Sequence, residues 1–168
     1  MDFKKFIEKA KVSSFYLWLL NWQASRMVPF NKPHGFKILE LTDTEIKTFI
    51  PYKKSNFNHI KGLHATAMAT LAEFTSGFLL ISRIDPGKYR IILTKLEMEY
   101  FYQGKSDGFG SFQLSDDWLN TMVYQPLENQ ESTVVKCPVK IVDTEGNHLA
   151  TGTSHWQVKN WLKVKTKI

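Results

Sequence analysis

A chain of 168 residues is long enough for one domain with a hydrophobic core and too short for two domains of typical size. Hydrophobic residues make up 43% and aromatic residues 14%, so a packed globular interior is expected. The single cysteine, Cys137, excludes an internal disulfide, and the five histidines lack the partner spacing of a zinc site, so no metal is expected.

The formal net charge is +6, and lysines gather near both ends of the chain. Such groups suit a phosphate-bearing ligand, an acidic membrane surface or nucleic acid, or they act only as solubilising charge. Because the basic residues are not interleaved with aromatics in a strand motif, no nucleic-acid partner is expected. The apolar run 15–20 is too short to span a bilayer and no secretory signal is visible, so we expect a cytoplasmic protein without integral membrane association.

Residues 2–25 predict an amphipathic helix capped by Asp2, within an N-terminal segment 1–30 that precedes the first strand. We expect this helix to pack on the protein's own sheet. A ligand pocket or a membrane surface stays open as an alternative, because the aromatic density is more than one face needs: Phe15, Tyr16, Trp18 and Trp22. Pro29, Pro33 and Gly35 then break the helix.

Strands are predicted near 36–42, 45–52, 89–102 and 106–114, and a hairpin follows on either side of a turn at 143–147. Residues 115–131 look polar and irregular, with a short helical turn. Pro138 argues for an edge or a bulge in the first strand of the hairpin. With a long helix between the second and third strands, this order predicts an α+β fold, an antiparallel sheet curled around one buried helix.

The predicted central helix, residues 62–82, carries one charge before its end, the carboxylate of Glu73. A nearly uncharged helix is normally buried, and an acid within it is costly unless it is hydrogen-bonded or kept for chemistry. By helical geometry Glu73 faces a stripe of small residues, which lets a helix, a sheet or a ligand approach closely: Thr66, Ala69, Ser76 and Gly77.

The start of this helix is the second chemical feature. Free N–H groups around His64 to Thr66 would stabilise the oxyanion formed at an attacked carbonyl. A buried carboxylate with a raised pKa is a good general base near neutral pH. Together the two features suggest acyl transfer with water as the acceptor.

These residues carry a family resemblance. The pattern Asn58-x3-Gly62-x-His64-Ala65, followed by Leu71-Ala72-Glu73 and Gly77, resembles the signature of hotdog-fold acyl-CoA thioesterases, of the phenylacetate-degradation type and its uncharacterised relatives. In that family an Asn precedes a His-Gly-Gly turn and an Asp or Glu follows on the central helix. The last hairpin, with Ile141-Val142-Asp143 and Gly146, is also similar. The resemblance implies a single hotdog domain over residues 1–168.

The resemblance also implies roles. Glu73 would be the general base or nucleophile at the thioester carbonyl, and the N–H of Ala65, with that of His64 or Thr66, would hold the carbonyl oxygen. Asn58 would position water or substrate, His64 would be a catalytic residue that transfers a proton, and Gly62 would belong with Ala65 and Thr66 to the oxyanion and substrate-binding turn. The substrate would be an acyl-CoA, or an acyl carrier protein thioester, with coenzyme A as part of the substrate and no separate cofactor. The site would lie in a homodimer, often paired again into a tetramer.

Other readings stay open. His-Ala-Thr replaces the family's His-Gly-Gly, which leaves a non-catalytic module that binds acyl-CoA or a fatty acid. His59, fourteen residues before Glu73, resembles the acid–base pair of hotdog dehydratases. Glu73 could be a structural acid, His64 a helix cap and Asn58 a turn residue.

Overall fold

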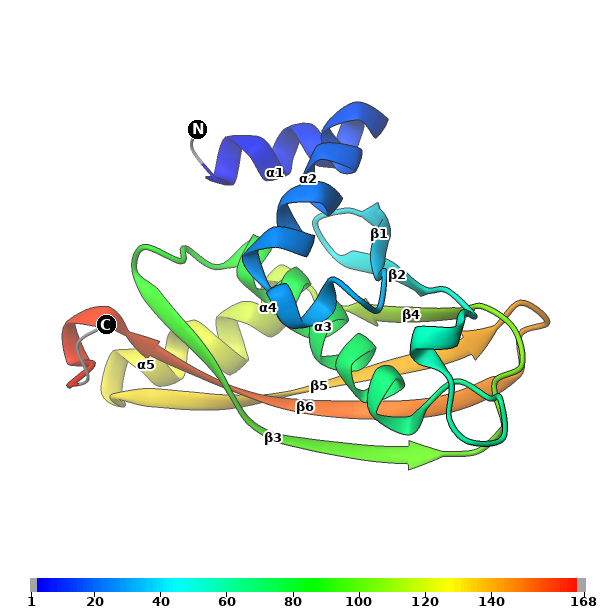
Figure 1. The fold of residues 1–168 in the computed structure, drawn as a ribbon. Coiled ribbons are helices and arrows are strands. Elements are labelled where there is room, and N and C mark those ends of the chain that lie inside the picture. The colour runs from blue at the N-terminus through cyan, green and yellow to red at the C-terminus, as the bar shows by residue number, and fades with distance from the viewer. Residues whose placement is uncertain (1–2, 166–168) are drawn as a thin grey trace.

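The computed structural model describes residues 3–165 and shows a six-stranded antiparallel sheet curled around one long helix, α3 (Figure 1). The sheet order is β1-β2-β4-β5-β6-β3. The strands are β1 Lys37–Leu41, β2 Glu45–Ile50, β3 Tyr89–Tyr100, β4 Gly108–Gln113, β5 Ser132–Asp143 and β6 His148–Asn160. The helices are α1 Phe3–Val12, α2 Ser14–Met27, α3 Ala65–Arg83, α4 Asp116–Leu119 and α5 Gln125–Asn129. The predicted α+β hotdog architecture is confirmed.

Helix α3 lies in the core because its apolar face meets the concave side of the sheet. Leu71, Ala72, Leu79 and Leu80 have no exposed surface. Gly152 of β6 sits so close to α3 that an added Cβ would lie 2.4 Å from the Cβ of Ala72. By length and composition alone α3 could cross a membrane, as core helices of folded domains also can. Its packing against the sheet is the arrangement of a soluble domain.

The N-terminal segment forms two helices, so the single helix expected over 2–25 is wrong. Ser13 is extended, with φ −138° and ψ 121°, and stands as the N-terminal cap residue of α2. The helix breaks there because Val12, Ser13 and Ser14 are poor helix formers that favour extended or capping positions. The expected cap, Asp2, lies outside the described residues. The two helices pack beside β1, where the Asn21 side chain accepts from the Ile38 N–H at 2.7 Å and donates to its carbonyl at 2.9 Å.

Residues 116–129 are helical almost throughout, where an irregular stretch was expected. A π-helical turn, Asn120–Tyr124, joins α4 to α5. Ser115 caps α4 by accepting from the Trp118 N–H at 3.0 Å. Apolar residues recur every fourth position, at Leu119, Val123 and Leu127, and pack against the core. The polar residues between them concealed this spacing in the sequence.

The final hairpin follows the sequence expectation. Pro138 pairs only toward β6, because the pairing of β4 with β5 ends at Lys140, so the proline sits at a local edge. At the turn, the Asp143 carboxylate accepts from the backbone N–H groups of Glu145 and Asn147 and from the Asn147 side chain. Cys137 is buried, and burial raises the pKa of its thiol to about 12, so it acts as a core residue.

Candidate functional site

The loop before α3 is shaped by Asn58. Its side-chain oxygen accepts from the N–H groups of Ile60, at 3.1 Å, and Gly62, at 2.8 Å. Its own N–H donates to the Gly62 carbonyl, and Lys61 between them adopts a left-handed φ of 57°. Asn58 therefore acts here as a turn residue, with its amide nitrogen left as a donor. Since the Gly62 N–H is already used, Gly62 contributes loop shape and no free donor.

The N-terminus of α3 leaves the N–H groups of Ala65 and Ala67 without a partner among the described residues, and of these two residues Ala65 is exposed and Ala67 buried. His64 is the cap residue, and its Nδ1 accepts from the Thr66 N–H at 3.2 Å and lies 2.8 Å from the Thr66 hydroxyl. Because Nδ1 is an acceptor, the ring proton is left to Nε2. The Ala65 N–H has no hydrogen-bond partner within residues 3–165. His64, Ala65 and Thr66 are all exposed, so this donor is open to a ligand.

A neighbouring residue, Asn56, holds this loop in place and was not among the predicted site residues. It is 1% exposed. Its amide nitrogen donates to the carbonyls of His34 and Pro51, both at 2.9 Å, and its oxygen lies 2.9 Å from His34 Nδ1. Its carbonyl accepts from the His64 N–H at 2.8 Å. The sequence shows Asn56 only as a second Asn in the same segment as Asn58. Its hydrogen-bond partners could not be predicted from the sequence.

Glu73 lies two turns further along α3 and is half-buried. Across the described residues its carboxylate makes no hydrogen bond or ion pair. Burial without a compensating partner raises the pKa of the Glu73 carboxyl above its ordinary value. Such a group has the properties of a proton acceptor or nucleophile, since no interaction of this chain stabilises its charge.

The small-residue stripe beside Glu73 is partly used by the sheet. Ser76 accepts from the indole N–H of Trp156 at 3.0 Å. An added Cβ on Gly77 would lie 2.6 Å from the same indole. The remaining members, Thr66 and Ala69, are not fully buried. The stripe therefore serves helix–sheet packing in its second half and stays accessible toward the N-terminus of α3.

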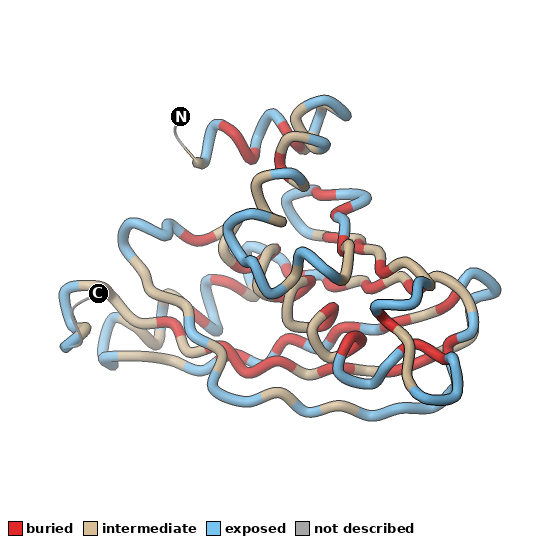
Figure 2. Tube along the Cα trace, in the orientation of Figure 1, coloured by how far each residue is buried: buried red, intermediate tan, exposed pale blue. Residues whose placement is uncertain are grey.

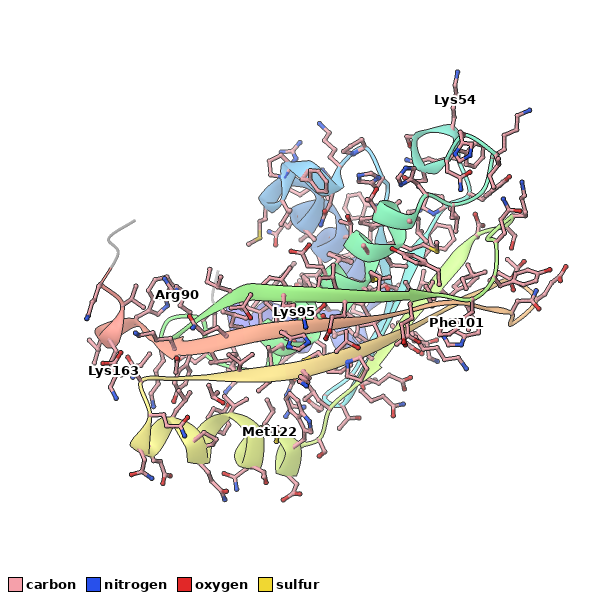
Figure 3. All side chains as sticks on the ribbon, turned by 90° about the horizontal axis from the view of Figure 1, so that it is seen from below. Lys54, Arg90, Lys95, Phe101, Met122 and Lys163 are labelled. Atoms are coloured by element: carbon pink, nitrogen blue, oxygen red, sulfur yellow. The ribbon has the colours of Figure 1, made fainter. Side chains whose placement is uncertain are left out.

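Strand β3 runs along the same side as this accessible surface and forms one edge of the sheet. Its inner face carries Leu96, Met98 and Tyr100, and the Tyr100 hydroxyl donates to the Ala65 carbonyl at 3.0 Å. On the outer face Glu97 pairs with Lys95 and His155. Figure 3 views the strand from below, with Lys95 midway along it and Arg90 and Phe101 toward its two ends.

Two surface hollows lie away from Glu73. One, of about 580 Å³, lies by the start of β3 and α5 and includes Lys88, Tyr89, Tyr124 and Lys163. The other, of about 480 Å³, lies on the outer face of the sheet near Trp118 and Pro138. Neither is lined by Glu73. No three His, Cys, Asp or Glu side chains within residues 3–165 group together as metal ligands would.

Residues 17–158 match the family described as a domain of unknown function, DUF4442. The chain belongs to this family. No curated protein matches it. Among solved structures, a Pseudomonas aeruginosa protein of unknown function described as a probable thioesterase, PA5026, is 18% identical with a TM-score of 0.78, over 84% of this chain and 94% of that one.

Two further structures extend the similarity. A Shewanella oneidensis protein described as a putative thioesterase is 19% identical with a TM-score of 0.68, over 85% of this chain and 96% of that one. The Haemophilus influenzae thioesterase HI1161 is 14% identical with a TM-score of 0.69, over 92% of this chain and 97% of that one. At these identities the similarity establishes a shared fold.

Proposed function

We propose that this protein hydrolyses acyl-CoA thioesters as a homodimer, with Glu73 as general base or nucleophile at the thioester carbonyl. The observation that carries the proposal is the half-buried Glu73 carboxylate, which has a raised pKa and no partner within the described chain. A group of this kind destabilises the fold, and a role in chemistry is a reason for a protein to keep it. Water is the acyl acceptor, and coenzyme A enters only as part of the substrate.

The second element of the site is the free Ala65 N–H at the start of α3. This donor and the positive end of the helix dipole stabilise the negative charge that develops on the carbonyl oxygen. Ala65 and Glu73 are eight residues apart on one helix, which is about 12 Å along its axis. A single carbonyl cannot contact both groups of one chain. Each site therefore combines Glu73 of one protomer with the α3 N-terminus of the other.

The edge strand β3 supports such a dimer. It is twelve residues long and hydrogen-bonds to β6 on one side only. An open edge of this length is a template for a second strand, here the same strand of a second copy. Half-buried apolar residues on its inner face, Leu96 and Met98, would be covered by that copy. Further pairing of dimers into a tetramer, and a cytoplasmic location, remain predictions.

The remaining predicted residues support this site indirectly. His64 holds the N-terminal turn of α3 through its bond to the Thr66 N–H, so Thr66 contributes helix geometry and no free donor. Asn58 fixes the loop, and its amide nitrogen is free to position water or the thioester. An acyl carrier protein thioester is the alternative substrate, since the same chemistry serves both carriers.

The test is a panel of acyl-CoA substrates of increasing chain length, with release of free thiol as the readout. We expect hydrolysis by the wild type and a loss of kcat in Glu73→Gln, which keeps the size of the side chain and removes its charge. His59→Ala is the matched control, because His59 is an exposed loop residue. Acyl-CoA binding without hydrolysis would favour a binding module, and hydration of an enoyl-CoA that depends on His59 would favour a hydratase.

A further inference from the structure

The N-terminal helices carry an exposed aromatic surface that the proposed thioesterase site does not use. On α2, Phe15, Trp18, Trp22 and Arg26 follow one another at spacings of three and four residues, which places them on one face. Phe15 is 62% exposed, Trp18 61% and Trp22 43%. We call these four residues the α2 outer face. Figures 1 and 2 show α1 and α2 beside β1 at the top of the view, with extensive exposed surface.

The opposite face of α2 packs against the rest of the fold. Leu20 is buried, Leu17 packs against the core, and Asn21 is bonded to the backbone of Ile38. Helix α2 is thus apolar on both sides. A helix of that kind is normally covered on both sides. Among residues 3–165 only the inner side is covered, so the outer face is suited to an external apolar phase.

Basic groups bracket the aromatic rings. At one end the guanidinium of Arg26 lies 3.8 Å from the centre of the Trp22 ring. At the other end Lys9 of α1 approaches Tyr16, with Nζ 3.4 Å from its hydroxyl, and Tyr16 contacts Phe15 edge to face. Phe15 in turn stacks on Trp18, with ring centres 6.1 Å apart. The contacts of Tyr16, Phe15 and Trp18 form one cluster with Lys9 beside it, and Trp22 with Arg26 follows one turn further along the same face.

Most of the net charge of the chain lies in its N-terminal segment, although Lys11 there pairs with Glu8 and Asp43. Residues 1–37 contain seven basic and two acidic residues, a net charge of +5, whereas the remaining residues contain fifteen basic and fourteen acidic ones. Tryptophan rings favour the boundary between water and lipid, and lysine or arginine beside them favours anionic headgroups. An apolar protein partner would explain the rings and leave the concentrated positive charge unexplained.

We propose that the α2 outer face, with Lys9 of α1 and the exposed Lys5 one helical turn before it, docks this protein on anionic phospholipid surfaces. The rings of Phe15, Trp18 and Trp22 enter the headgroup region, while the lysine and arginine stems extend to the lipid phosphates. Binding is peripheral and reversible, since no segment of α2 is inserted across the bilayer. This inference does not rest on the proposed thioesterase activity.

The test is co-sedimentation of the full-length protein with vesicles of phosphatidylcholine alone, or of phosphatidylcholine mixed with phosphatidylglycerol. We expect binding to the mixed vesicles, little binding to the neutral ones, and weakening with salt. Trp18→Ser with Trp22→Ser should lower the affinity at least about tenfold. Lys9→Gln alone should lower it about fivefold at low salt.

Matched controls use similar residues elsewhere. Phe101→Ser removes an equally exposed ring beyond the end of β3, and Lys136→Gln with Lys140→Gln removes charge from the outer face of β5. These variants should bind vesicles like the wild type. The proposal is overturned if the wild type ignores anionic vesicles, if it binds neutral ones equally well, or if the controls weaken binding as much. It is also overturned if the tryptophan variants dissociate an oligomer instead, which would identify the surface as a contact between copies.

Discussion

Replacing Glu73 by Gln should stabilise the protein while it removes activity. In the folded chain the Glu73 carboxyl is half-buried and unpaired, and burial raises its pKa. At neutral pH the native state must therefore carry a poorly solvated charge that the unfolded chain exposes to water. Gln keeps the shape of the side chain and removes that charge.

The magnitude follows from the half-exposed setting. Replacing an unfavourable group at a functional site typically raises the free energy of unfolding by about 1 kcal/mol. For a chain of this size, that corresponds to an increase of about 2–4 °C in Tm. A raised pKa means that the native state favours the protonated acid, so wild-type stability is lost as pH rises through the folded pKa. The advantage of Gln should thus be fully present above the folded pKa and vanish as pH falls below the ordinary glutamate pKa of about 4.3, where the acid becomes protonated in both states.

The assay is thermal unfolding of both proteins across that pH range, combined with kcat at each pH. Glu97→Gln is a suitable control, because Glu97 is paired with Lys95 and His155 and its pKa is lowered. That variant should gain nothing at high pH. If Glu73→Gln were instead less stable than the wild type at neutral pH, Glu73 would be a structural acid with a partner, and the reasoning would be refuted.

Three further outcomes follow from the geometry. Ala65→Pro should lower kcat by about 10²–10³-fold, the usual effect of losing one oxyanion donor. Its Tm should stay nearly unchanged, because Pro suits the first helical position and the His64 ψ of 139° suits a residue before Pro. An unaffected kcat would exclude this donor. Gly152→Val should lower the unfolding free energy by about 1–3 kcal/mol, because its Cβ would lie 2.4 Å from that of Ala72; chemical denaturation measures this, and an unchanged midpoint would contradict the close helix–sheet contact. Asp143→Asn should destabilise the final hairpin at neutral pH, because hydrogen bonds hold the Asp143 pKa below its ordinary value. The difference in Tm between variant and wild type should shrink as pH falls through that lowered pKa. A Tm difference that stays constant down to acid pH would exclude this role.

Much of the fold was readable from the sequence because local patterns and tertiary structure agree. The alternation of Leu96, Met98 and Tyr100 with charged neighbours gave the two faces of β3, and the single charge at Glu73 marked the core helix. The break at Ser13 was missed because the apolar spacing on both sides of it looks continuous, and only the extended backbone of one residue separates the two helices.

The site was less predictable because its donors depend on contacts within the loop. Nothing in the spacing of residues told which N–H groups would be occupied. The structure gives the Gly62 N–H to Asn58 and the Thr66 N–H to His64, and leaves that of Ala65 free. The support from Asn56 depends on Pro51, directly after β2, and on His34, which precedes the β1–β2 pair; no periodic pattern links either residue to the loop.

The most direct test of the shared site mixes two inactive variants. Glu73→Gln lacks the carboxylate and Ala65→Pro lacks the donor, so neither homodimer has a complete site. After unfolding and refolding together, half of the dimers are mixed, and each contains one site with both groups intact, so about a quarter of wild-type activity should return. If Glu73 and the Ala65 N–H acted within one chain, mixing would restore nothing, and the two-protomer site would be contradicted.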